Sequence, residues 1–218
     1  MPVRTGACVL IVVILAASPA QAQLGAAWQH APTVAVISAA EGDARLDLVD
    51  EAVAFWNGAL GALGSGFRLG PVTRLVRPVP EDALRSMSLS VLGGMRGPAD
   101  IPQDLQGLPG DLTVMLGESD FVSFTGPFDG SGKRVIGIRG SSFPPMTFPS
   151  VTLNVIAHEL GHALGLRHNS DPSMLMCGRP SSCRPDLFRS GPRLFPLTDD
   201  EKRRRLQMYA PEWKPQRR

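Results

Sequence analysis

Three of the four histidines in this chain, His158, His162 and His168, lie within eleven residues. They belong to the stretch His-Glu-Leu-Gly-His-Ala-Leu-Gly-Leu-Arg-His, which has the pattern H-E-x-x-H-x-x-G-x-x-H. Residues four positions apart share one face of an α-helix, so His158 and His162 would present two ring nitrogens to one metal ion. Glu159 stands beside them, within reach of a water on that metal. Three neutral imidazoles and an open fourth position are typical of a catalytic zinc site.

Gly165 has a separate role in the pattern. A residue without a β-carbon readily adopts the left-handed conformation that ends a helix, so the chain turns there and His168 approaches the metal from another direction. The competing interpretation is an amphipathic core helix with incidental histidines. Its buried His and Glu side chains would then need other partners, so we favour one catalytic zinc ion.

The residues after His168 read Asn-Ser-Asp-Pro-Ser-Met-Leu-Met-Cys-Gly, with Pro172 four and Met176 eight positions beyond the histidine. Here the chain resembles the metzincins, zinc peptidases with the extended motif and a methionine-containing turn beneath the metal, and most of all the matrixin type. The resemblance implies an α+β domain with a twisted mixed β-sheet, an active-site helix and a C-terminal helix. It makes Met176 the turn methionine. Met174 is a weaker candidate, and core filling is the alternative for both.

The resemblance also implies hydrolysis of protein or peptide substrates by an endopeptidase. Zinc lowers the pKa of a bound water to about 7 and polarises the scissile carbonyl, while Glu159 acts as general base and then protonates the leaving amine. Two alternatives stay open. One is a zinc-binding module without proteolysis, against which the retained Glu159 argues; the other is a zinc amidase acting on cell-wall peptides. The sequence does not determine substrate, cleavage preference or oligomeric state.

Some positions depart from the metzincin pattern. Matrixins have Ser where this chain has Asn169, and some metzincins have Tyr where it has Gly178. Only His30 remains outside the motif, so the structural zinc site of matrixins is not expected, and calcium stays open. No cysteine of the mature chain precedes the motif, so the family's latency switch is missing. We expect His30 to be a surface residue, with an inhibitory metal ligand as the alternative.

The N-terminal segment predicts export. It has a basic residue at Arg4, an apolar run over residues 7–17 and a small-x-small site at residues 20–22, which together indicate a secretory signal peptide, residues 1–22. The run is too short for a membrane span. We expect a single catalytic domain over residues 23–218, secreted or periplasmic, without a stable membrane anchor. It keeps 21 of the 22 basic residues against 20 acidic ones, a balance that predicts no nucleic-acid partner.

Two cysteines remain in that mature chain, Cys177 and Cys183. In an exported protein, a pair in a turn-rich loop predicts a disulfide. It would begin beside Met176 and shape the pocket wall below the metal. The alternative is a free Cys177 thiolate that binds and silences the zinc.

The elements expected to position these residues follow from periodicity and turn signals. Trp56 is expected in the core, and Thr198-Asp199-Asp200-Glu201 predicts a capping box at the last helix. We expect the cluster at residues 202–205 to be a solvated face, with an acidic partner as the alternative.

The resemblance implies an antiparallel edge strand that binds substrate, for which we choose residues 134–139. Strands are predicted at 33–38, 67–77, 112–116 and 134–139, and helices at 44–60, 80–91, from 151, and 198–209.

Overall fold

A five-stranded mixed sheet forms the centre of the fold, and its strands are arranged in the order β2-β1-β3-β5-β4. The computed structural model describes residues 27–93, 102–127, 132–178 and 193–215, so the predicted signal peptide lies outside the described residues. Neighbouring strands are parallel except at one edge, where β4 pairs antiparallel with β5. The strands are β1 (Val34–Ser38), β2 (Val72–Val76), β3 (Leu112–Leu116), β4 (Phe124–Pro127) and β5 (Arg134–Ile138).

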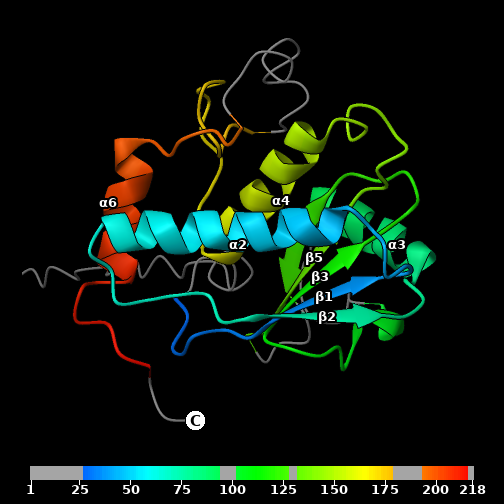
Figure 1. Cartoon of the computed structure of the whole chain (residues 1–218), viewed down its shortest axis with the longest axis horizontal. Helices are drawn as coiled ribbons and strands as arrows, with labels where there is room; N and C mark the ends of the chain where they lie inside the picture. Colours follow the sequence, from blue (N-terminus) through cyan, green and yellow to red (C-terminus); the bar gives the residue numbers. More distant parts are fainter. Residues whose placement is uncertain (1–26, 94–101, 128–131, 179–192, 216–218) are drawn as a thin grey trace, which may run out of the picture.

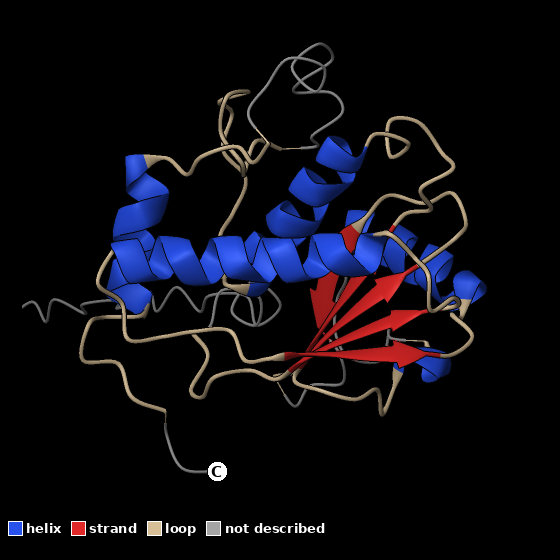
Figure 2. Cartoon of the chain, in the orientation of Figure 1, coloured by secondary structure: helices blue, strands red, loops and turns tan. Residues whose placement is uncertain are grey.

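Helices cover both faces of this sheet, because successive side chains of each strand point to opposite faces. One face packs against α2 (Arg45–Ala62) and α4 (Pro149–Ala163), and the other against α3 (Glu81–Leu92) and a short 3-10 helix, η2 (Gln103–Leu105). Figures 1 and 2 show α2 lying across the molecule with α4 beside it. The side chains on the α2–α4 face include Val36, Val114 and Ile136, and those on the α3 face include Ile37, Met115 and Val135.

Trp56 joins the two helices on the first face. Its ring is fully buried, and Nε1 donates a hydrogen bond of 2.8 Å to the backbone oxygen of Ala157 in α4. The prediction of a core aromatic is confirmed. Trp56 therefore fixes α4, the helix with two of the motif histidines, against α2.

The last helix, α6 (Asp199–Met208), begins with the predicted capping box. Thr198 Oγ1 accepts from the Glu201 backbone nitrogen at 3.1 Å, and Glu201 Oε2 accepts from the Thr198 backbone nitrogen at 2.8 Å. The expected solvated face at residues 202–205 is wrong for Arg205, which is 1% exposed and packs over the ring of Tyr209. Arg205 lies one turn after Glu201, which is also buried, so both share the inward face of α6.

The choice of residues 134–139 as the edge strand is wrong. These residues form β5, which lies inside the sheet between β3 and β4. The antiparallel edge is β4, whose sequence Phe-Thr-Gly-Pro lacks the β-branched run that marks a strand. The predicted strand at residues 67–77 begins only at Val72, after Gly70-Pro71.

The predicted α+β class, with a mixed sheet, a helix that carries the histidine motif and a C-terminal helix, is confirmed. Among the residues that the structure describes, no helix combines the length and apolar character needed to cross a membrane.

Candidate metal centre

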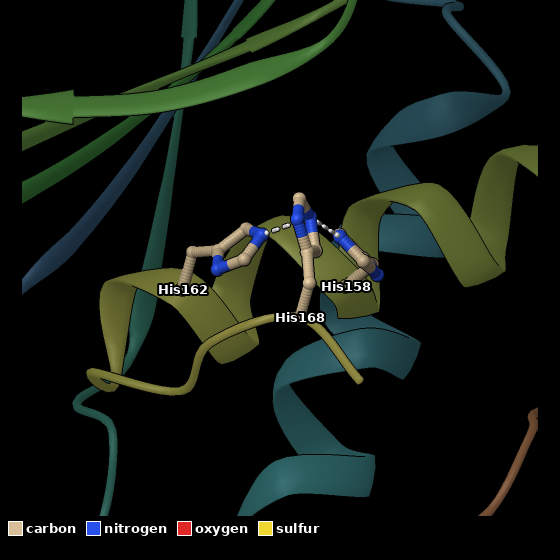
Figure 3. A group of neighbouring side chains, drawn as sticks. All are labelled: His158, His162 and His168. Atoms are coloured by element: carbon tan, nitrogen blue, oxygen red, sulfur yellow. Dashed lines mark hydrogen bonds between the residues drawn. The ribbon is translucent and has the colours of Figure 1, made fainter. Parts of the chain in front are cut away.

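The three motif histidines converge at the C-terminal end of α4. His158 and His162 lie one turn apart on the helix, and His168 reaches back from the segment that follows it (Figure 3). Gly165 allows this return, since its φ of 88° lies in the left-handed region that glycine adopts without strain. The structure therefore brings together the three residues predicted as metal ligands.

The ring nitrogens fit a metal ion. His168 Nε2 lies 2.9 Å from His162 Nε2 and 3.1 Å from His158 Nε2, and all three ligand atoms lie within 4.8 Å of one another. Around a tetrahedral zinc ion with bonds of about 2.0–2.1 Å, neighbouring nitrogens stand about 3.3 Å apart. The two distances from His168 Nε2 are close to that value.

The other ring nitrogens of the two helix histidines are held by the backbone. His158 Nδ1 lies 2.9 Å from the Leu175 oxygen, and His162 Nδ1 lies 2.8 Å from the Leu166 oxygen. Only a protonated nitrogen donates to a carbonyl, so in the neutral rings Nδ1 holds the proton and Nε2 is the nitrogen that could bind a metal. Burial lowers the pKa of His162, which favours the neutral, metal-binding form.

Glu159 directly follows His158 on α4, and its carboxyl is buried. Its side chain is 6% exposed, and burial raises its pKa from 4.5 to about 7. A hydrogen bond from Thr125 in β4 opposes that shift: Thr125 Oγ1 lies 2.7 Å from Glu159 Oε2. Sequence reasoning missed Thr125, because a lone threonine in an unrecognised strand belongs to no motif.

Met176 packs directly beneath α4. It is fully buried, and a β-carbon added to Gly161 would lie 2.4 Å from its sulfur. The same added atom would lie 3.0 Å from the ring of Trp56. A glycine is therefore required for the turn to approach the helix this closely. Met176, rather than the half-buried Met174, lies where the sequence predicted the turn methionine.

The turn that carries Met176 is pinned to the residue after the third histidine. The Asn169 backbone nitrogen donates to the Met176 oxygen at 2.8 Å, and the Gly178 nitrogen donates to the Asn169 oxygen at 3.0 Å. The Asn169 side chain bonds in turn to Glu201 of α6 at 2.7 Å. These contacts fix the chain on which His168 stands.

The two remaining predictions concern cysteine and the fourth histidine. Cys177 is fully buried beside Met176, but Cys183 lies outside the described residues, so the disulfide stays a prediction.

His30 Nε2 lies 3.3 Å from Asp111 Oδ1, and the His30 ring is partly exposed. Within the described ranges, the histidine group that could hold a metal does not include His30.

A cavity of about 490 Å³ opens beside Glu159, between α3, the segment before β4 and the N-terminal half of α4. Val151 and Val155 precede Glu159 at intervals of four residues on α4, so the three side chains form one stripe along the cavity. The facing side chains are mainly apolar: they include Leu89, Leu92, Phe121 and Val122. The cavity suits an apolar group held next to the carboxyl.

Comparison with known proteins points to the same region. The matrixin family model (Peptidase_M10) matches residues 111–189, which is less than half of the chain. Human matrix metalloproteinase-15 is 33% identical over 124 residues, which cover 49% of this chain and 17% of the human protein. An archaemetzincin structure from Methanopyrus kandleri aligns with a TM-score of 0.47 and 14% identity, covering 83% of this chain and 96% of the archaeal one. The sequence matches support a relationship to the metzincins.

Proposed function

We propose that this protein is an exported zinc-dependent endopeptidase of the metzincin type, resembling the matrixins. The observation that carries the proposal is the convergence of His158, His162 and His168, with the buried Glu159 directly after His158 on α4. The matches to matrixin sequences support the assignment. His158, His162 and His168 would hold one zinc ion, which when bound supplies Lewis acidity toward a carbonyl and activates a water molecule.

The residues of the chain would perform the proton transfers and hold the peptide. An extended peptide would add as a further strand beside β4, the last strand of the described sheet. An apolar side chain beside the scissile bond would enter the cavity at Val151 and Val155. Glu159 would then take a proton from the attacking water and deliver it to the leaving nitrogen. Burial raises the pKa of this carboxyl in the metal-free protein, so the side chain is able to hold a proton as well as to take one.

Export remains part of the proposal, because the supporting feature is the composition of residues 1–22. Mass spectrometry of the protein recovered outside the cytoplasm of an expressing cell would show whether the chain begins at Gln23. A chain that retains Met1 there would contradict cleavage of a signal peptide.

The deciding experiment is cleavage of a diverse peptide mixture by purified mature protein, read by mass spectrometry. Wild type, Glu159→Ala and a chelated sample run side by side. Cleavage by wild type alone, with apolar residues enriched beside the cleaved bond, is the expected result. A folded, zinc-loaded protein that cleaves no peptide would contradict the proposal. Cell-wall peptides and binding partners would be examined next in that case.

A further inference from the structure

We propose that Thr125 is a positioning residue that holds the Glu159 carboxyl for proton transfer; this inference rests on the proposed function. Thr125 lies on β4 and Glu159 on α4, 34 residues apart in sequence. The threonine would act through Glu159.

The contact is short, buried and two-fold. Thr125 Oγ1 lies 2.7 Å from Glu159 Oε2 and 2.8 Å from the backbone oxygen of Glu159. Both residues are buried, at 5% and 6% exposure. Among the described residues, Thr125 provides the side-chain hydrogen bond to the Glu159 carboxyl. Water is largely excluded, so the hydroxyl supplies the bond that a buried carboxyl requires.

The chemistry of a hydroxyl suits this position. A glutamate side chain has three rotatable bonds, and one anchored oxygen selects among its rotamers. A hydroxyl both donates and accepts hydrogen bonds, so it serves the carboxyl before and after a proton arrives. A displacement of about 1 Å in a reacting group costs on the order of 100-fold in rate. Loss of the anchor would therefore reduce turnover without removing the base.

The same bond relates the base to the strand that would bind substrate. The backbone of Thr125 is paired with Ile136 in β5, and this pairing fixes the position of Thr125 along the strand. Among the described strands, β4 is the outermost at this end of the sheet, where an extended peptide would add. Thr125 therefore sets the position of the Glu159 carboxyl relative to the peptide that β4 would hold.

Three variants test the proposal. Thr125→Val keeps the shape and removes the hydroxyl, while Thr125→Ser keeps the hydroxyl. Thr113→Val is the matched control, because Thr113 is a fully buried residue of β3 whose hydroxyl donates to the Pro109 oxygen at 2.6 Å, outside the proposed catalytic group. Zinc content and melting temperature establish that each variant is folded and loaded. Activity is measured as kcat and KM on a peptide from the cleavage survey.

We expect Thr125→Val to lower kcat by about 10- to 100-fold with KM changed less than about twofold. Thr125→Ser should restore kcat to within about threefold of wild type, and Thr113→Val should leave it within about twofold, since neither disturbs the bond to Glu159. A zinc-loaded Thr125→Val protein with wild-type kcat would overturn the positioning role and leave the proposed function intact.

A second measurement needs no activity. In metal-free protein, Thr125→Val is made in the wild-type and in the Glu159→Ala background, and the shift in melting temperature is compared. Glu159→Ala leaves the backbone oxygen as an acceptor for the Thr125 hydroxyl and removes the carboxyl, so a larger shift in the wild-type background reports the contact with the carboxyl. Equal shifts would overturn the proposal. A wild-type protein that cleaves no peptide would instead refute the proposed function, and this cycle would still decide whether Thr125 holds Glu159.

Discussion

Asn169 donates a hydrogen bond of 2.7 Å from Nδ2 to Oε1 of Glu201, a residue 32 positions further along the chain. Glu201 is 4% exposed, and its other carboxylate oxygen completes the capping box of α6. Asn169 directly follows His168, so α6 is connected to the third proposed metal ligand through one side chain.

Asn169→Ala tests this link. Loss of a hydrogen bond to a buried carboxylate should lower the free energy of unfolding by about 1.5–3 kcal/mol. Zinc affinity should fall about 10-fold, because outer contacts orient the ligands. The measurements are urea unfolding and competition with a chromophoric chelator. Thr198→Ala is the control: it removes the cap, at a cost of about 1 kcal/mol, and leaves Asn169 in place. Equal losses of zinc affinity in both variants would contradict a role for Asn169.

The proposed ligands and the proposed base should separate by mutation. His162→Ala removes one of three nitrogens and should abolish stable zinc binding. Glu159→Ala should bind zinc with a stoichiometry of one and lose nearly all turnover. Metal content by mass spectrometry and peptide cleavage are measured on the same samples. Full peptidase activity in Glu159→Ala would refute the assignment of the base.

Gly161→Ala adds a single methyl group and should strongly lower the free energy of unfolding. The added carbon would meet the sulfur of Met176 at 2.4 Å and the ring of Trp56 at 3.0 Å, and such overpacking costs about 1–3 kcal/mol. Gly58→Ala on the exposed face of α2 is the matched control, since an added carbon there meets nothing within 4 Å. The free energy of unfolding of that variant should rise by up to about 1 kcal/mol, because alanine has a higher helix propensity than glycine. Urea unfolding distinguishes the two variants. Similar stabilities would show that the turn with Met176 does not pack closely against α4.

The raised pKa of Glu159 predicts a pH dependence of stability in the metal-free protein. The unfolded carboxyl titrates near 4.5 and the folded one near 7, so between these values the folded state holds a proton that the unfolded state has released. The stabilisation is therefore complete below pH 4.5 and is lost as the pH rises toward 7, by about 3 kcal/mol.

Glu159→Gln, which cannot titrate, isolates this effect from that of His162. The lowered pKa of His162 acts in the opposite direction and is present in both proteins. Urea unfolding at pH 4.5, 5.5 and 7 should show the two stability curves diverging as the pH rises. Parallel curves would mean that the Glu159 carboxyl titrates normally.

The predicted disulfide between Cys177 and Cys183 is tested by thiol titration of denatured mature protein. The expected result is no free thiol before reduction and two after it. Two free thiols in the active, unreduced protein would exclude the disulfide and favour the Cys177 thiolate as a possible zinc ligand.

The sequence predicted best those parts of the site that depend on local geometry. Helical spacing places His158 and His162 together, and Gly165 returns the chain at His168, so the ligand group needs no distant contact. Thr125 and the edge position of β4 depend on strand pairing between distant segments, which no local pattern encodes. The burial of Arg205 has the same explanation. Its basic neighbours predicted a solvent-exposed side chain, but tertiary packing places Arg205 against Tyr209.

The backbone contacts of the two helix histidines have a consequence for the speed of metal exchange. Rotating either ring away from the centre breaks its bond to the carbonyl of Leu166 or Leu175, in the segment that follows α4. Release of a bound ion therefore requires that segment to open locally. The rate of exchange should follow the opening of the turn, as hydrogen exchange of its amides would report, and be slow even where the equilibrium affinity is ordinary.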